Sequence, residues 1–136
     1  MKEELKGPKV ENIAVAVVQE LGENNAMIHN VYLINEKKET LENVLVTSKG
    51  YAFSAKTNEK LETNILRKLL GDIKANSVQM IEPIMEDVLG LNNEYWVSFW
   101  VGTKMYDKKY IFLSETIKEE NFINIPILNK KGVLLR

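Results

Sequence analysis

The sequence contains one histidine, His29, and histidine is the side chain best suited to acid–base chemistry near neutral pH. A hydrolase triad would pair His29 with a serine on a strained turn, typically in a G-x-S-x-G motif, and no serine in the sequence lies in such a motif. The serines weighed for this role are Ser48, Ser54, Ser77, Ser98 and Ser114. The 136 residues include no cysteine, which excludes thiol nucleophiles, disulfides and thiolate zinc sites. We therefore predict a protein that is not an enzyme and has no catalytic residue.

Adjacent carboxylates are a second arrangement that could share a proton or hold a cation. They occur as Glu3-Glu4, Glu86-Asp87 and Glu119-Glu120. Neighbouring residues on a helix point in different directions, so Glu86 and Asp87 are poorly placed to share a proton. No calcium loop of the D-x-D-x-D-G kind and no glycine-rich phosphate loop is present in the sequence. We expect no cofactor and no metal ion.

Charge is nearly balanced along the chain. The formal net charge is −1, which gives no basic footprint for nucleic acid or for an anionic membrane. Lysine pairs such as Lys108-Lys109 fall near expected turns and strand ends, where solvated lysines discourage edge-to-edge pairing. The lysines and aromatic residues of 106–112 could stack single-stranded nucleic acid, but their alternation is also what a sheet core requires. We therefore expect neither a nucleic-acid partner nor a membrane partner.

The sequence also shows no secretory signal and no membrane-spanning segment. Residues 1–12 are charged where a secretory signal has its apolar core, and the longest aliphatic run, residues 13–18, is far too short to span a membrane. We expect a cytoplasmic protein with one domain over residues 1–136, including a flexible N-terminus at residues 1–9.

The element on which the rest of the chain depends is an aromatic hairpin. Residues 95–101 and 108–114 read as strands, and residues 102–107 carry turn chemistry between them. A pairing of Val101 with Lys108 would place Phe99 opposite Tyr110 on one face. The other face would then hold Trp96, Trp100, Ile111 and Leu113.

Both faces of this hairpin are apolar, which is typical of a central position in a sheet with a cover on each side. One cover would be a second sheet, and the other would be a C-terminal tail, a partner or a second copy. The sequence alone leaves open which face is buried.

Further strands are predicted within residues 9–21, 26–35 and 41–48, the last ended by Lys49-Gly50, with a short fourth strand at Tyr51 and Phe53. Residues 63–70 fit a helix or a strand equally well. Residues 77–81, before Pro83, fit a strand near the edge of a sheet or the end of a strand, and residues 83–91 fit a single helical turn. Pro126 makes residues 115–136 an edge strand or a tail lying across a sheet.

These elements together predict an all-β fold, an antiparallel β-sandwich of about seven strands with one short helical connector. The strand, polar connector and strand of residues 31–46, with Asn35 and the run Leu41-x-Asn43-Val44, resemble a hairpin of immunoglobulin-like sandwich modules of the cell-adhesion-related bacterial type. Residues 70–81 resemble the segment that precedes the last hairpin in those modules. The resemblance implies an immunoglobulin-like fold.

The chain also resembles a family of short bacterial proteins labelled phenylalanyl-tRNA synthetase subunit alpha, at residues 9–12, 44–51, 86–89 and 130–134. The label implies a role in translation, in association with a synthetase or tRNA. A catalytic subunit of that kind would need an arginine that grips ATP phosphates and a glycine-rich strand bearing arginine. The two arginines here, Arg67 and Arg136, lie beside no glycine cluster, so we interpret the label as erroneous.

The remaining signal is a surface. With the opposite face of the hairpin in the core, Trp96, Trp100, Ile111 and Leu113 would form an exposed apolar patch of the kind that binds proteins. We predict a non-catalytic protein-interaction or accessory module that binds a protein partner or forms a homodimer. The alternatives are a translation-related protein and a sandwich that binds a small ligand between its aromatic strands.

Overall fold

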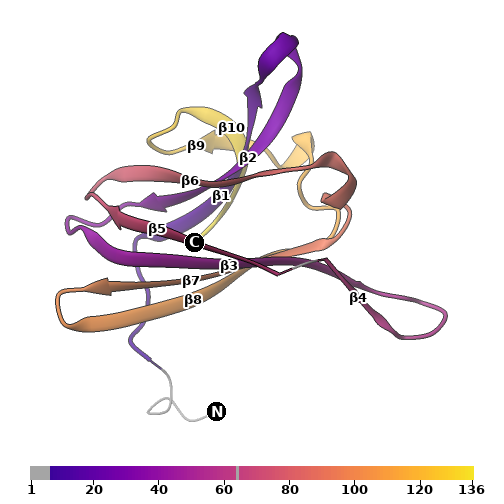
Figure 1. Cartoon of the computed structure of the whole chain (residues 1–136). Helices are drawn as coiled ribbons and strands as arrows, with labels where there is room; N and C mark the ends of the chain where they lie inside the picture. The colour runs from indigo at the N-terminus through magenta and orange to yellow at the C-terminus, as the bar shows by residue number, and fades with distance from the viewer. Residues whose placement is uncertain (1–6, 64) are drawn as a thin grey trace.

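The computed structural model describes residues 7–63 and 65–136, which form two antiparallel β-sheets (Figure 1). Sheet A contains, in spatial order, β6 (Ser77–Ile84), β2 (Met27–Asn35), β1 (Ile13–Leu21), β10 (Lys130–Leu135) and β9 (Ile123–Ile125). Sheet B contains β3 (Leu41–Phe53), β4 (Lys60–Glu62), β5 (Leu66–Ile73), β7 (Asn92–Val101) and β8 (Lys104–Phe112).

In sheet B, β3 pairs with β7 along one edge and with both β4 and β5 along the other, and β7 pairs with β8. The predicted all-β sandwich is confirmed, with ten strands in the described residues where the sequence predicted about seven. One of the additional strands, β4, is three residues long, too short to produce an alternating pattern.

The core lies between the sheets and follows from alternation along each strand. On β1, Ile13, Val15 and Val17 point inward and are almost fully buried. On β7, Val97 and Phe99 do the same from the opposite sheet. Each such side chain contributes roughly 1.5–3 kcal/mol on burial. The residues between them on each strand necessarily point to the outer face of their sheet.

The helical content of the described residues is three short 3-10 turns, η2 (Glu23–Asn25), η3 (Glu86–Val88) and η4 (Glu119–Asn121). The turn η3 is the short helical connector predicted for residues 83–91. Pro83 lies in β6, which is an edge strand as predicted, and is paired with Asn30. No helix in the described ranges has both the length and the apolar character needed to cross a membrane.

The aromatic hairpin is present as β7 and β8, but the predicted register is wrong. Val101 pairs with Lys104 instead of Lys108, because the turn consists of Gly102 and Thr103 alone. Gly102 has φ +61°, and a positive φ at this position is typical of two-residue hairpin turns. The shift is an even number of residues, so every side chain of β7 and β8 stays on its predicted face.

The predicted central position of this hairpin is wrong for β8, and the chain itself covers only one face of the hairpin, so a cover by a partner or a second copy stays a prediction. Strand β8 is an edge strand, and the outer face of sheet B carries Trp96 and Trp100 at 46% and 40% exposure. The C-terminal segment cannot cover that face, because β9 and β10 pair within sheet A. Within residues 115–136, β9 is the predicted edge strand, whereas β10 lies inside the sheet between β1 and β9.

Two further differences lie in the middle of the chain. Lys49-Gly50 does not end the third strand, because β3 continues to Phe53 and includes the predicted short fourth strand. The open choice for residues 63–70 resolves as strand from Leu66 onward. Residues 1–6 of the predicted flexible N-terminus lie outside the described residues, and residues 7–9 are exposed without regular structure.

Candidate protein-interaction surface

The outer face of sheet B is arranged in rows of side chains that lie opposite one another on neighbouring strands. One row consists of Arg67 on β5, Thr47 on β3, Trp96 on β7 and Lys109 on β8. Another row places Trp100 between Glu42 of β3 and Met105 of β8. Both tryptophans therefore sit on the central strand of the face, flanked by charged and apolar neighbours.

Apolar side chains continue across this face from β5 to β8. Leu69 lies opposite Leu45, and the two occupy the row between the tryptophan rows. Leu69 is 71% exposed, so it projects from the sheet edge into solvent. Other large exposed apolar residues of the face are Ile65, Met105 and Phe53. A contiguous patch of this kind is characteristic of a contact site, since single exposed apolar residues are common but clusters are not.

A shallow groove of about 380 Å³ lies beside Trp96. It is lined by Leu45, Thr47, Lys49, Ile65, Arg67, Glu94, Trp96 and Lys109. The Lys109 ammonium lies 4.8 Å from the Trp96 ring centroid, a cation–π contact, and 4.0 Å from a Glu94 carboxylate oxygen. The groove is thus apolar along its floor and basic along its rim.

Three of the four residues predicted for this surface lie on it, and the fourth, Leu113, does not. Trp96, Trp100 and Ile111 point outward from sheet B, with Ile111 opposite Glu94. Leu113 lies one residue beyond β8 and lines a separate groove with Thr116 and Leu135, on the side of the sandwich between β8 and β10.

Sequence reasoning missed the contributions of β3 and β5 to this face. Leu45, Lys49, Ile65, Arg67 and Leu69 surround the tryptophans, yet they are far from them in sequence. Residues 41–48 were predicted as a strand without an assignment of its faces, and residues 63–70 fitted a helix as well as a strand. Only the cross-strand register brings these residues to Trp96.

The centre of the outer face of sheet A is closed by its own side chains, whereas Ile28, Met80 and Ile123 nearer its edges are exposed. Ala14, Ala16 and Val18 of β1 are fully buried there, although they point away from the main core. They are small residues, and the larger side chains of Tyr32 and Leu134 on the neighbouring strands pack against them. This cluster is the sealed face of the molecule.

A hydrogen-bonded carboxylate, Glu20, lies at the rim of the sealed face. Its Oε1 accepts hydrogen bonds from Asn30 Nδ2 at 2.9 Å and Tyr32 Oη at 2.6 Å, and its Oε2 accepts one from Lys130. Burial alone would raise the pKa of Glu20, but the hydrogen bonds from Lys130, Tyr32 and Asn30 outweigh it and lower that pKa. Burial and the bond to Glu20 raise the pKa of Tyr32 to about 12. This network links three strands of sheet A.

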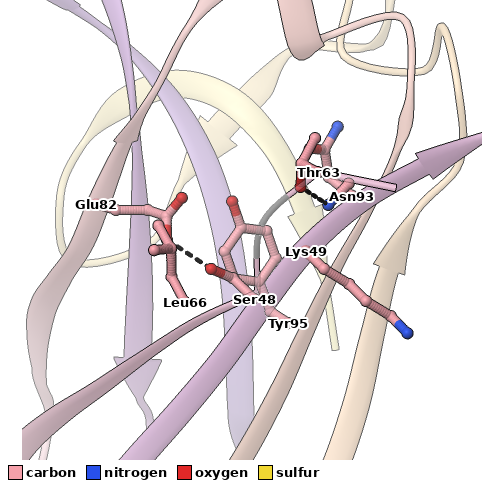
Figure 2. Close-up of a pocket in the computed structure, with 8 residues that line it drawn as sticks. Ser48, Lys49, Thr63, Leu66, Glu82, Asn93 and Tyr95 are labelled. Carbon is pink, nitrogen blue, oxygen red and sulfur yellow. Dashed lines mark hydrogen bonds between the residues drawn. The ribbon is translucent and has the colours of Figure 1, made fainter. Parts of the chain in front are cut away.

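A small polar crevice lies between the sheets and contains one of the serines weighed for catalysis (Figure 2). Ser48 Oγ donates a hydrogen bond of 2.7 Å to Glu82 Oε1, beside Tyr95 and Asn93, while the Lys49 side chain extends away from the crevice. Burial, with a smaller effect of the Glu82 charge, raises the pKa of Tyr95. The volume of about 60 Å³ has room for a few water molecules but not for a drug-sized ligand.

His29 does not contribute to that crevice. It lies on β2 of sheet A, where its ring meets Phe122 edge-on at a centroid distance of 6.4 Å. Ser48 therefore has a carboxylate beside it but no imidazole to act as its base. Among the described residues, no three acidic, histidine or cysteine side chains gather closely enough to hold a metal ion.

The aromatic residues named for a ligand cavity also lie apart. Trp96 and Trp100 face outward, whereas Tyr110 is buried and its hydroxyl donates a 3.0 Å hydrogen bond to the Ile13 carbonyl oxygen. That bond ties sheet B to sheet A across the core. Comparison of the chain with protein-family models, curated proteins and solved structures finds no match.

Proposed function

We propose that this chain is a non-catalytic protein-interaction module that binds its partner through the outer face of sheet B. The observation that carries the proposal is the contrast between the centres of the two outer faces, one closed by the chain itself and the other presenting Trp96 and Trp100 to solvent. Tryptophan and arginine are the residues most enriched at energetically dominant positions of interfaces, and Arg67 shares the row of Trp96.

We further propose that the sandwich is of the immunoglobulin-like type and works in the cytoplasm. Two antiparallel sheets joined by chain crossings, as at β2 to β3 and β6 to β7, support the first point. A sequence free of cysteine supports the second, since secreted sandwiches often carry an intersheet disulfide.

A translation-related role is the second candidate, favoured by the three cations Lys49, Arg67 and Lys109 around Trp96, which could hold a nucleic-acid backbone beside a stacked base. Acidic residues on the same face, including Glu42 and Asp107, oppose it. Binding of tRNA that weakens steeply with salt and is lost in Lys109→Glu would favour this candidate.

The proposed function is tested by photo-crosslinking in the native cell. A photoreactive phenylalanine analogue replaces Trp96 in one variant and exposed Lys131, on β10 of sheet A, in a matched control. We expect a discrete protein adduct from position 96 and none from position 131. Equal labelling from both positions, or none from position 96, would contradict the proposal.

A further inference from the structure

Charges on the outer face of sheet B are segregated along the strand direction. The row and flank of Trp96 carry the bases Arg67, Lys109 and Lys49. The acid Glu94 in that half is 8% exposed and lies beneath Lys109, so the solvent-facing charge there is positive.

The half around Trp100 has the opposite sign. Glu42 lies directly opposite Trp100 and is exposed. The row between the two halves contains Leu69, Leu45 and Ser98, and it ends at the exposed Asp107 on β8. The face is therefore nearly neutral in sum, but it is divided into a basic half and an acidic half.

A surface of this kind is complementary to itself. A twofold axis lying in the interface and crossing β7 near Ser98, midway between the tryptophans, would place each Trp96 over Trp100 of the other copy. The same rotation would bring Glu42 of the second copy beside Arg67, about one strand spacing or 4.8 Å away in projection. The same axis would bring Asp107 beside Asp107 of the other copy, with the Lys109 of each copy one row away.

The size of the face is adequate for this assembly. Four strands spaced about 4.8 Å apart and a ten-residue β7 rising about 3.3 Å per residue give a projected area of roughly 600 Å². Side chains that project from it add accessible surface, and a stable interface buries about 800 Å² on each partner. An acidic peptide or a nucleic acid would complement only the basic half.

We propose that the partner of this face is a second copy of the chain, in a twofold dimer that packs the outer face of sheet B against itself and pairs Arg67 with Glu42 of the other copy. The inference rests on the proposed function and names its partner. It is tested by sedimentation equilibrium of the wild-type chain and of charge variants.

The wild type is expected at twice the chain mass of 15.6 kDa. Arg67→Glu and Glu42→Lys should each weaken dimerisation by about tenfold or more, because each places like charges together. The double variant Arg67→Glu/Glu42→Lys should recover most of the lost affinity. Lys131→Glu, a charge reversal on sheet A, is the matched control and should dimerise normally. Thermal unfolding of each variant establishes that it is folded.

Failure of the dimer proposal and failure of the proposed function give different results. A monomeric wild type at all concentrations, combined with crosslinking of another protein from position 96, would overturn the dimer and leave the proposed function standing. A monomer without any crosslinking would overturn both. A dimer that is insensitive to Trp100→Asp and to both charge reversals uses another surface and would also overturn the inference.

Discussion

The two outer faces of this sandwich are built from the same pleated geometry but are completed in different ways. On sheet A, β1 presents Ala14, Ala16 and Val18, and side chains from adjacent strands close over them. On sheet B, β7 presents Trp96 and Trp100, which stand above their neighbours and stay exposed. Small residues on a central strand let a sheet cover itself, whereas large aromatic residues there leave the covering to a partner.

The largest expected effect comes from a charge placed in the sealed face. Ala16 is fully buried with Tyr32 and Leu134 as direct cross-strand neighbours, so Ala16→Asp would bury a carboxylate with no cation beside it. We expect a loss of unfolding free energy of about 4 kcal/mol or more, measured by urea denaturation. A loss below about 1 kcal/mol would mean that this face opens readily.

The next effect in size concerns the close approach of two strands in sheet A. A Cβ at Gly132 of β10 would collide with the backbone of Val17 and Val18 on β1, and backbone atoms cannot move aside as a flexible side chain could. Gly132→Ala should therefore destabilise the fold by about 1–3 kcal/mol. Gly90→Ala is the matched control, since nothing lies near its Cβ position and its φ is not positive. Equal stability of the two variants would contradict this explanation.

A smaller effect, dependent on pH, is expected at Glu20. Its pKa is lower in the folded chain, so Glu20 stabilises the fold above its unfolded value, near 4.5, and this contribution is lost as pH falls through the folded pKa. Glu20→Gln should cost about 1–2 kcal/mol at pH 7 and should flatten the stability profile below pH 4.5. Urea denaturation between pH 3 and pH 7 measures both. A variant with the wild-type slope in acid would exclude this role.

The smallest stability effect is expected on the open face. Trp96→Ser removes a half-exposed ring and its contact with Lys109, which together should contribute less than about 1 kcal/mol to folding. The same variant should lose most of its partner binding, because a ring of this size dominates an interface that buries it. A large loss of stability with binding retained would reverse the roles assigned to the two faces.

Much of the fold could be predicted from alternation and turn chemistry. The aromatic hairpin and the placement of Trp96 and Trp100 on one face follow from side-chain parity, and the edge position of β6 follows from Pro83. Parity did not decide which face of the hairpin points outward. Parity does not determine register, which is why Val101 was paired four residues away from its actual partner. Beyond Tyr51, β3 pairs with β4, a three-residue strand without a pattern of its own.

The surface itself was only partly predictable for the same reason. Arg67, Thr47, Trp96 and Lys109 come from four strands and meet in one row only after the sheet has formed. The exposure of the face was not predictable either, because apolar residues on both sides of a hairpin favour two covers and the chain provides one. The contact between Glu20 and Lys130, 110 residues apart, is likewise invisible in a single sequence.

The chain contains two tryptophans, and both lie on the outer face of sheet B, so intrinsic tryptophan fluorescence reports on this surface alone. Emission and acrylamide quenching of the wild-type chain are measured as its concentration rises through the range of self-association, with Arg67→Glu as the control. We expect emission to shift to shorter wavelength and quenching to fall in the wild type, as the rings leave water, and neither to change in the variant over the same range. Rings that remain equally hydrated while sedimentation shows dimers would contradict burial of this face by a second copy.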